Sequence, residues 1–190
     1  MSASKEILRA YRGFGASMRR QMATSPGEER LLAYLVIACL IFFVARVPNL
    51  LELSAARATD EVSSIAIFVT NLVGSFFFAP LMLYGLAAIS HIIARGFAGH
   101  GSFFHARLAL FWALLVVSPL ALLSTVLQTA LPFGWLEQVL WLVKFLVFAF
   151  AWASCLSEAE GYKSPMLTMS AIILTGFGLT LLFRVLLSVG

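Results

Sequence analysis

The sequence predicts an all-α membrane protein, a bundle of five transmembrane helices preceded by a basic amphipathic helix at the membrane surface. Of the 190 residues, 61% are hydrophobic and 12% are charged, whereas a soluble domain has roughly 25% charged residues. The apolar residues gather in runs that are long enough to cross a bilayer as a helix, which takes about 20 residues. No segment alternates with the period of two that the strands of a membrane β-barrel need.

Five apolar runs are expected to form the transmembrane helices of a membrane domain over residues 31–190. A helix satisfies its own backbone hydrogen bonds, which a hydrocarbon environment requires. Pro48 is expected to end the first helix, whereas Pro80 and Pro119 lie inside the second and third and should each introduce a kink. The expected spans cover residues 31–47, 63–94, 104–131, 135–156 and 166–189.

Basic residues are distributed unequally between the two ends of these spans. Nine Lys and Arg side chains are expected on the side of the N-terminus, and one, Arg57, on the opposite side. Short loops rich in Lys and Arg stay in the cytoplasm. We therefore predict a multi-pass protein of the bacterial inner membrane, with a cytoplasmic N-terminus and a periplasmic C-terminus. The nine residues are Lys5, Arg9, Arg12, Arg19, Arg20, Arg30, Arg95, Arg107 and Lys163.

Residues 1–30 are expected to form a cytoplasmic arm in which residues 5–22 are one amphipathic helix. At about 100° per residue, its apolar and basic side chains fall on opposite faces. Such a helix lies in the membrane surface with its bases near anionic lipids. The alternative is a docking surface for a partner protein. The apolar stripe is Ile7, Tyr11, Phe14, Met18 and Met22, and the basic face is Lys5, Arg9, Arg12, Arg19 and Arg20.

Lys144 is expected deep inside the fourth span, about 15 Å from its beginning at about 1.5 Å per residue. A charge within a membrane is costly and marks a functional candidate. Glu137, two turns earlier on the same side of the helix, and Asn71 in the second span are its candidate polar partners. Two interpretations stay open, a structural contact between helices and a polar cavity. Arg46 and Arg184 lie near span ends, where long side chains reach the membrane surface.

The stretch "SEAEGYKSP" between the fourth and fifth spans is expected to be a cytoplasmic turn with solvated side chains. Gly161 is placed to end the fourth helix in a left-handed conformation. The candidate residues of the turn are Glu158, Glu160, Gly161 and Tyr162. His91, His100 and His105 flank the preceding cytoplasmic loop, but their spacing matches no compact helical metal pair. Solvation at the interface is therefore favoured over a metal site.

The sequence contains no Gly-rich phosphate loop, no HExxH and no CxxC. We expect no enzymatic activity, no cofactor, no metal and no nucleic-acid partner. The expected partners are the lipid bilayer, anionic lipids at the arm, other membrane proteins or a second copy of the chain. These features favour a membrane adaptor or organiser, or a protein that shapes the bilayer. The alternative is a transporter or channel for a small solute or a lipid, which oligomerisation would assist.

Two ordered stretches carry a resemblance to a known family. "FFFAPLMLYGLAAISHIIARGFAGHGSF" followed by "HARLALFWALLVVSPLALL" resembles bacterial members of the Yip-one (Ypt-interacting protein) family, and "EAEGY" is similar to its acidic-Gly-aromatic turn. The resemblance extends from about residue 25 onwards. It implies five spans, an outside C-terminus and no catalytic residues. Eukaryotic members bind small GTPases in vesicle traffic, but this sequence lacks their Asp-Leu-Tyr-Gly-Pro stretch.

Overall fold

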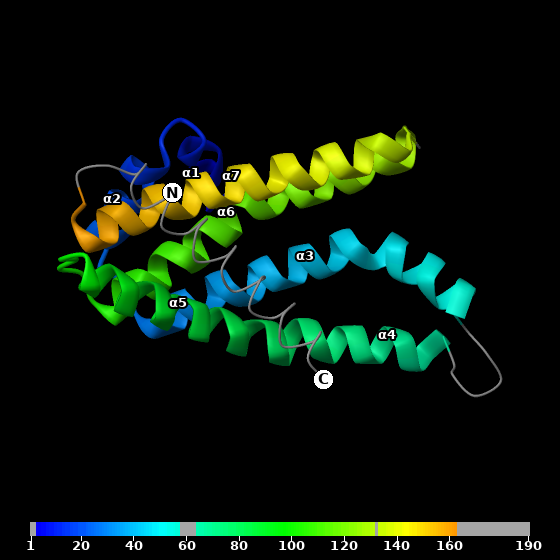
Figure 1. Ribbon diagram of the computed structural model, residues 1–190, viewed down its shortest axis with the longest axis horizontal. Helices are drawn as coiled ribbons and strands as arrows, with labels where there is room; N and C mark the ends of the chain where they lie inside the picture. Colours follow the sequence, from blue (N-terminus) through cyan, green and yellow to red (C-terminus); the bar gives the residue numbers. More distant parts are fainter. Residues whose placement is uncertain (1–2, 58–63, 132, 163–190) are drawn as a thin grey trace, which may run out of the picture.

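The computed structural model describes residues 3–57, 64–131 and 133–162, and within these ranges it contains helices and no strand. The segments α4, η1 and α5 follow one another directly and make one continuous rod (Figure 1). The elements are α1 (Ala3–Ala10), α2 (Phe14–Ala23), α3 (Glu28–Arg57), α4 (Ser64–Val73), the π-helical turn η1 (Gly74–Phe78), α5 (Ala79–Gly96), α6 (Phe103–Ala130) and α7 (Gly134–Glu160).

Four helical segments of the described chain are long and apolar enough to cross a membrane. They are Glu28–Ala55, Ile65–Gly96, Phe103–Ala130 and Gly134–Glu160. These segments agree with the first four predicted spans to within a few residues, except at the end of the first. The predicted fifth span, residues 166–189, lies outside the described residues. The structure therefore supports a multi-pass helical membrane protein and does not test the count of five.

Pro48 does not end the first span, as the sequence predicted, but lies inside α3, which continues to Arg57. A proline within a helix leaves a backbone carbonyl without its partner and bends the helix. Thr125 of α6 donates a hydrogen bond to the carbonyl of Ala45, three residues before the proline, at 2.8 Å. The carbonyl that Pro48 leaves without its helical donor is that of Val44, so the Thr125 bond joins α6 to α3 beside the interruption and does not fill it. Figure 1 shows the resulting bend in the last part of α3.

Pro80 is accommodated by a wide turn rather than by a simple kink. It is the second residue of α5, directly after the π-helical turn Gly74–Phe78. A π-turn shifts the backbone hydrogen bonds from the fourth to the fifth preceding residue, and it is a common cause of a helix irregularity. Pro119 lies inside α6, as predicted.

Helix α6 is the centre of the bundle, because α3, α5 and α7 all pack against it. Its half nearest the arm is thoroughly buried, with Leu108, Phe111 and Trp112 in the core. Large apolar side chains such as Phe77 and Trp141 are exposed on the outer helices. An apolar surface of this kind suits hydrocarbon and not water.

The arm folds as two helices and not as the single helix predicted over residues 5–22. The chain turns between them, where the backbone N–H of Gly13 donates to the carbonyl of Ala10 at 2.9 Å. Gly13 is extended, and glycine costs a helix about 1 kcal/mol relative to alanine. The break therefore falls where the helix is intrinsically weak. It lets both helices lie against the end of α6 and α7 (Figure 1).

Candidate functional site

The inward face of α2 is buried against the bundle and held there by paired polar groups. Met18 is fully buried. Trp112 of α6 donates from Nε1 to Oγ of Ser17 at 3.1 Å, and Tyr34 of α3 donates from its hydroxyl to Oε1 of Gln21 at 2.8 Å. Buried polar groups need such partners. These two bonds consequently specify one position of α2 on the end of the bundle.

The apolar stripe of the arm, which the sequence predicted to face lipid, packs in part against the bundle. Ile7, Phe14 and Met22 pack against the core of the bundle. The hydroxyl of Tyr11 donates to the carbonyl of Val116 at 2.7 Å, and burial raises the pKa of Tyr11 above its usual range. The sequence pattern does not reveal this contact, because it depends on the apolar surface that the ends of α6 and α7 offer close by.

The structure divides the predicted basic face into two groups, Lys5, Arg9 and Arg12 on one hand and Arg19 and Arg20 on the other. Arg19 forms an ion pair with Glu158 of α7, and Nε of Arg20 lies 3.3 Å from Oε2 of Glu6. The first group is exposed, and within the described part of the chain none of its members forms an ion pair. The first group therefore remains accessible to an external partner.

Glu160 at the end of α7 is completely buried and has a partner on each carboxylate oxygen. Oε1 lies 2.6 Å from Nδ1 of His91 in α5 in a hydrogen bond, and both side chains are at most 1% exposed. Oε2 accepts from the backbone N–H of Gly101 at 3.0 Å. The backbone carbonyl of Glu160 accepts from the N–H of His100, also at 3.0 Å. Glu160 thus ties α7 to α5 and to the loop that precedes α6.

Gly101 permits this close approach because it has no side chain. A Cβ at this position would lie 2.7 Å from Oε2 of Glu160 and would also collide with the carbonyl of Ala159. Glycine is the residue that allows another backbone to come so near. Gly99 and Gly101 of the "GFAGHG" stretch therefore have a packing role at this junction, whereas a Cβ at Gly96 would meet nothing within 4 Å.

Gly161 and Tyr162 complete the junction. Gly161 ends α7 in the left-handed conformation, with φ of 79°, as the sequence predicted. Its turn directs Tyr162 back to α5, where the hydroxyl donates to the carbonyl of Ala94 at 2.5 Å. Burial and the nearby carboxylate of Glu160 raise the pKa of Tyr162 above its usual range. The tyrosine therefore stays a neutral hydrogen-bond donor at physiological pH.

This junction corrects the prediction of a solvated turn. Glu158 and Glu160 do point to different sides, as their spacing predicts, but one meets Arg19 and the other is buried with His91. The partner of Glu160 is 69 residues away in the sequence, so no local pattern indicates it. Among the described residues, no group of three His, Cys, Asp or Glu side chains is placed to hold a metal ion.

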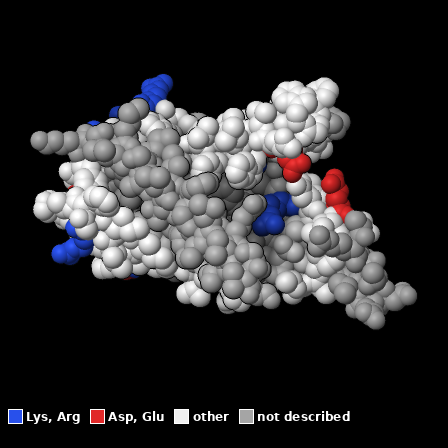
Figure 2. Space-filling view, viewed as in Figure 1, with Lys and Arg blue, Asp and Glu red and all other residues white. Residues whose placement is uncertain are grey.

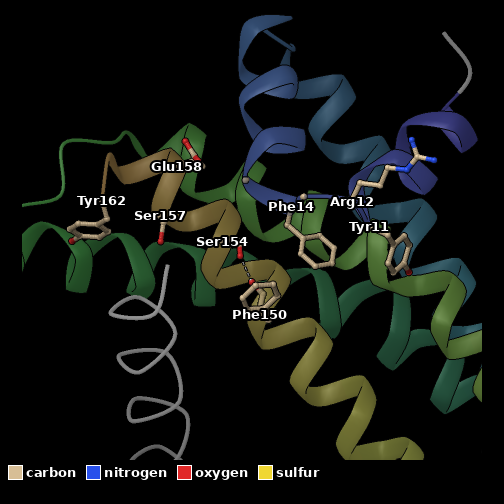
Figure 3. A pocket seen from close by; sticks show the side chains of 10 residues that line it. Tyr11, Arg12, Phe14, Phe150, Ser154, Ser157, Glu158 and Tyr162 are labelled. Atoms are coloured by element: carbon tan, nitrogen blue, oxygen red, sulfur yellow. Dashed lines mark hydrogen bonds between the residues drawn. The ribbon is translucent and has the colours of Figure 1, made fainter. Parts of the chain in front are cut away.

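A cavity of about 390 Å³ lies between the turn of the arm and the last turns of α7 (Figure 3). The ring of Phe14 meets the ring of Phe150 edge to face, with centroids 5.9 Å apart. Glu158 and Tyr162 lie at the end of α7 beyond these rings, as Figure 3 shows. The cavity thus combines aromatic walls with a few polar groups, at the place where the arm docks.

The intramembrane candidates are only partly brought together. Lys144 lines a second cavity, of about 370 Å³, between α3, α6 and α7, and Arg46 of α3 lines the same cavity. Glu137 acts on Lys144 electrostatically but is not among the residues that line the cavity. Asn71 donates to the carbonyl of Ile67 in its own helix at 2.9 Å. Sequence reasoning missed the contribution of Arg46, because a position near a span end suggested only contact with the membrane surface.

Comparison of the chain with protein-family models, with curated proteins and with solved structures finds no match.

Proposed function

We propose that this chain is a non-enzymatic membrane protein of the Yip-one type that acts as an adaptor or organiser of the bilayer. The observation that carries the proposal is the docked arm. Its inward face packs against the bundle, through groups such as Met18 and Gln21. Its outward face keeps charged groups without internal ion pairs. A rigidly mounted basic surface suits recognition of a partner.

The outward face of α1 combines charge with one apolar side chain. Lys5, Leu8 and Arg9 follow the spacing of neighbours on one helix face, and Arg12 follows in the adjoining turn. Leu8 is 71% exposed. A basic surface with an exposed apolar residue is typical of contact with anionic lipid, where each base is worth about 1 kcal/mol. We define these four residues as the outward arm face and propose anionic lipid as its partner.

The placement in the membrane follows from the same charges. We propose the bacterial inner membrane, with the arm in the cytoplasm and the C-terminus in the periplasm. Arg19 of α2 forms an ion pair with Glu158 near the end of α7, and Arg107 near the start of α6 forms an ion pair with Glu28 at the start of α3. The basic residues of the described loops and arm accordingly share one end of the bundle, which is the pattern of a cytoplasmic face.

The proposal is tested by reversing the charges of the outward arm face. The triple variant K5E/R9E/R12E is extracted from membranes in polymer nanodiscs, and the co-purifying lipids and proteins are identified. We expect the ratio of phosphatidylglycerol to zwitterionic lipid to fall to that of the bulk membrane, because the three favourable charges become repulsive. The matched control K5R/R12K keeps the charge and should retain the enrichment. An unchanged set of lipids and proteins in the triple variant would contradict the proposal.

The alternative function, a transporter or channel, is favoured by one specific observation. Lys144 lines a cavity within the membrane-spanning region and does not only pack between helices. If this cavity is part of a pathway, Lys144→Leu should abolish flux of small anions in proteoliposomes while the protein still inserts. Leu140→Ala, a change on the same helix outside the cavity lining, is the matched control. Flux that is equal in the wild type, in Lys144→Leu and in empty liposomes would remove this alternative.

A further inference from the structure

The cavity between α3, α6 and α7 has an unusual charge for its location. Helices α3 and α7 both pack on α6, and the cavity lies in the fork between them. Its lining includes two cations, Arg46 and Lys144, and no acidic side chain among the described residues. Figure 2 shows Lys or Arg side chains inside a hollow on one face of the molecule, with Asp or Glu side chains at the edge of the same hollow.

Neither cation forms an ion pair within the described part of the chain. No ion pair or hydrogen bond from Arg46 or Lys144 is formed there. Glu137 is the acid that acts on Lys144, from a distance beyond an ion pair.

Two cations in a membrane-spanning region that form no ion pair among the described residues are costly, and an anion between them offsets that cost. An Arg guanidinium binds phosphate through two parallel hydrogen bonds, and a Lys ammonium binds it as a point charge. The side-chain amides of Asn49 and Gln128, which also line the cavity, offer further donors. Trp141 and Phe148 supply apolar walls.

We propose that this cavity binds an anionic phosphate group, held between the guanidinium of Arg46 and the ammonium of Lys144. The phosphate belongs either to the headgroup of an anionic lipid or to a free phosphate ion. The rim favours the lipid, because Arg46, Asn49 and Trp141 are all exposed between α3 and α7. This site is independent of the outward arm face, because it lies on α3, α6 and α7. It is also independent of the alternative function, because binding a phosphate group requires no transport across the membrane.

The test uses the full chain purified in an uncharged mild detergent. Phosphatidylglycerol, phosphatidylcholine and inorganic phosphate are added in separate arms, and binding is followed by native mass spectrometry and by the shift of the unfolding temperature. We expect saturable binding of phosphatidylglycerol with a rise in the unfolding temperature. Binding of inorganic phosphate instead would identify the free ion as the ligand and would also support the site.

The variants R46Q and K144Q each remove one cation while keeping a polar side chain. Each should weaken binding of the phosphate probe by about tenfold or more, which corresponds to one charged hydrogen bond. R46K and K144R keep the charge and should retain most of the binding, and R95Q, at an exposed base away from the cavity, should retain all of it. The triple variant K5E/R9E/R12E should also bind normally, which separates this site from the arm. Equal binding by wild type, R46Q and K144Q, or no binding of any probe by the wild type, would overturn the proposal.

Discussion

Replacing Glu160 with alanine is expected to lower the free energy of unfolding by about 3–5 kcal/mol. The change leaves His91 buried without its partner and removes the acceptor of the Gly101 N–H. An unpaired buried polar group carries its full desolvation cost, which is larger than the benefit of the bond itself. The measurement is thermal or SDS-induced unfolding of the full chain in mild detergent.

Glu158→Ala is the matched control, because it removes a carboxylate two residues away on the same helix. Its ion pair with Arg19 is partly exposed, with side chains 29% and 59% accessible. Exposed ion pairs contribute about 0–1 kcal/mol, so this variant should unfold almost as the wild type does. The double variant H91L/E160L should recover much of the loss, because two buried polar groups are removed together. Equal destabilisation by Glu158→Ala and Glu160→Ala would show that the buried Glu160–His91 pair contributes no more to the free energy of unfolding than the exposed ion pair does.

Met18→Ala is expected to weaken docking of the arm by about 2–5 kcal/mol, the usual cost of removing a fully buried large side chain. Met18 is fully buried between α2 and the bundle. Since the arm contacts the bundle through one end of α6 and α7, the loss should appear as local opening rather than as global unfolding. Hydrogen exchange of the α2 amides and tryptic cleavage at the arm should therefore accelerate, while exchange in α6 stays slow.

Leu8→Ala is the matched control on the same arm. Leu8 is exposed, and surface substitutions away from special features usually change stability by about 0.5 kcal/mol or less. Protection of α2 should therefore be unchanged in this variant. If both variants open the arm to the same extent, the docked position is not maintained by the buried face of α2.

The membrane helices were the most predictable part of the fold. Each apolar run is long enough to satisfy its own backbone hydrogen bonds, so the spans depend on local sequence. Their ends were less predictable, as Pro48 shows. Pro48 was expected to end the first span but lies inside α3, where Thr125 of another helix satisfies a nearby carbonyl. A proline within the membrane is compatible with both outcomes, so the sequence pattern does not decide between them.

The sequence indicated individual candidate residues but not which of them contact one another. Glu160 and His91 were both singled out, yet the sequence indicated solvation and the structure buries them together. Lys144 was expected to need a polar partner; Glu137 acts on it electrostatically, Asn71 bonds within its own helix, and the structure places a second cation, Arg46, in the same cavity. Spacing along a helix reveals which residues share a face. It does not reveal which face of another helix lies opposite.

The sequence by itself determined that this protein is built from apolar helices with basic residues concentrated beside one set of their ends. These properties follow from composition and from hydrogen bonding within each helix, which are local. Only the tertiary structure decided that the arm breaks at Gly13 and docks on α6 and α7, and that Glu160 meets His91. These contacts join residues that are far apart in the chain, because burial and pairing depend on the surfaces that packing brings together.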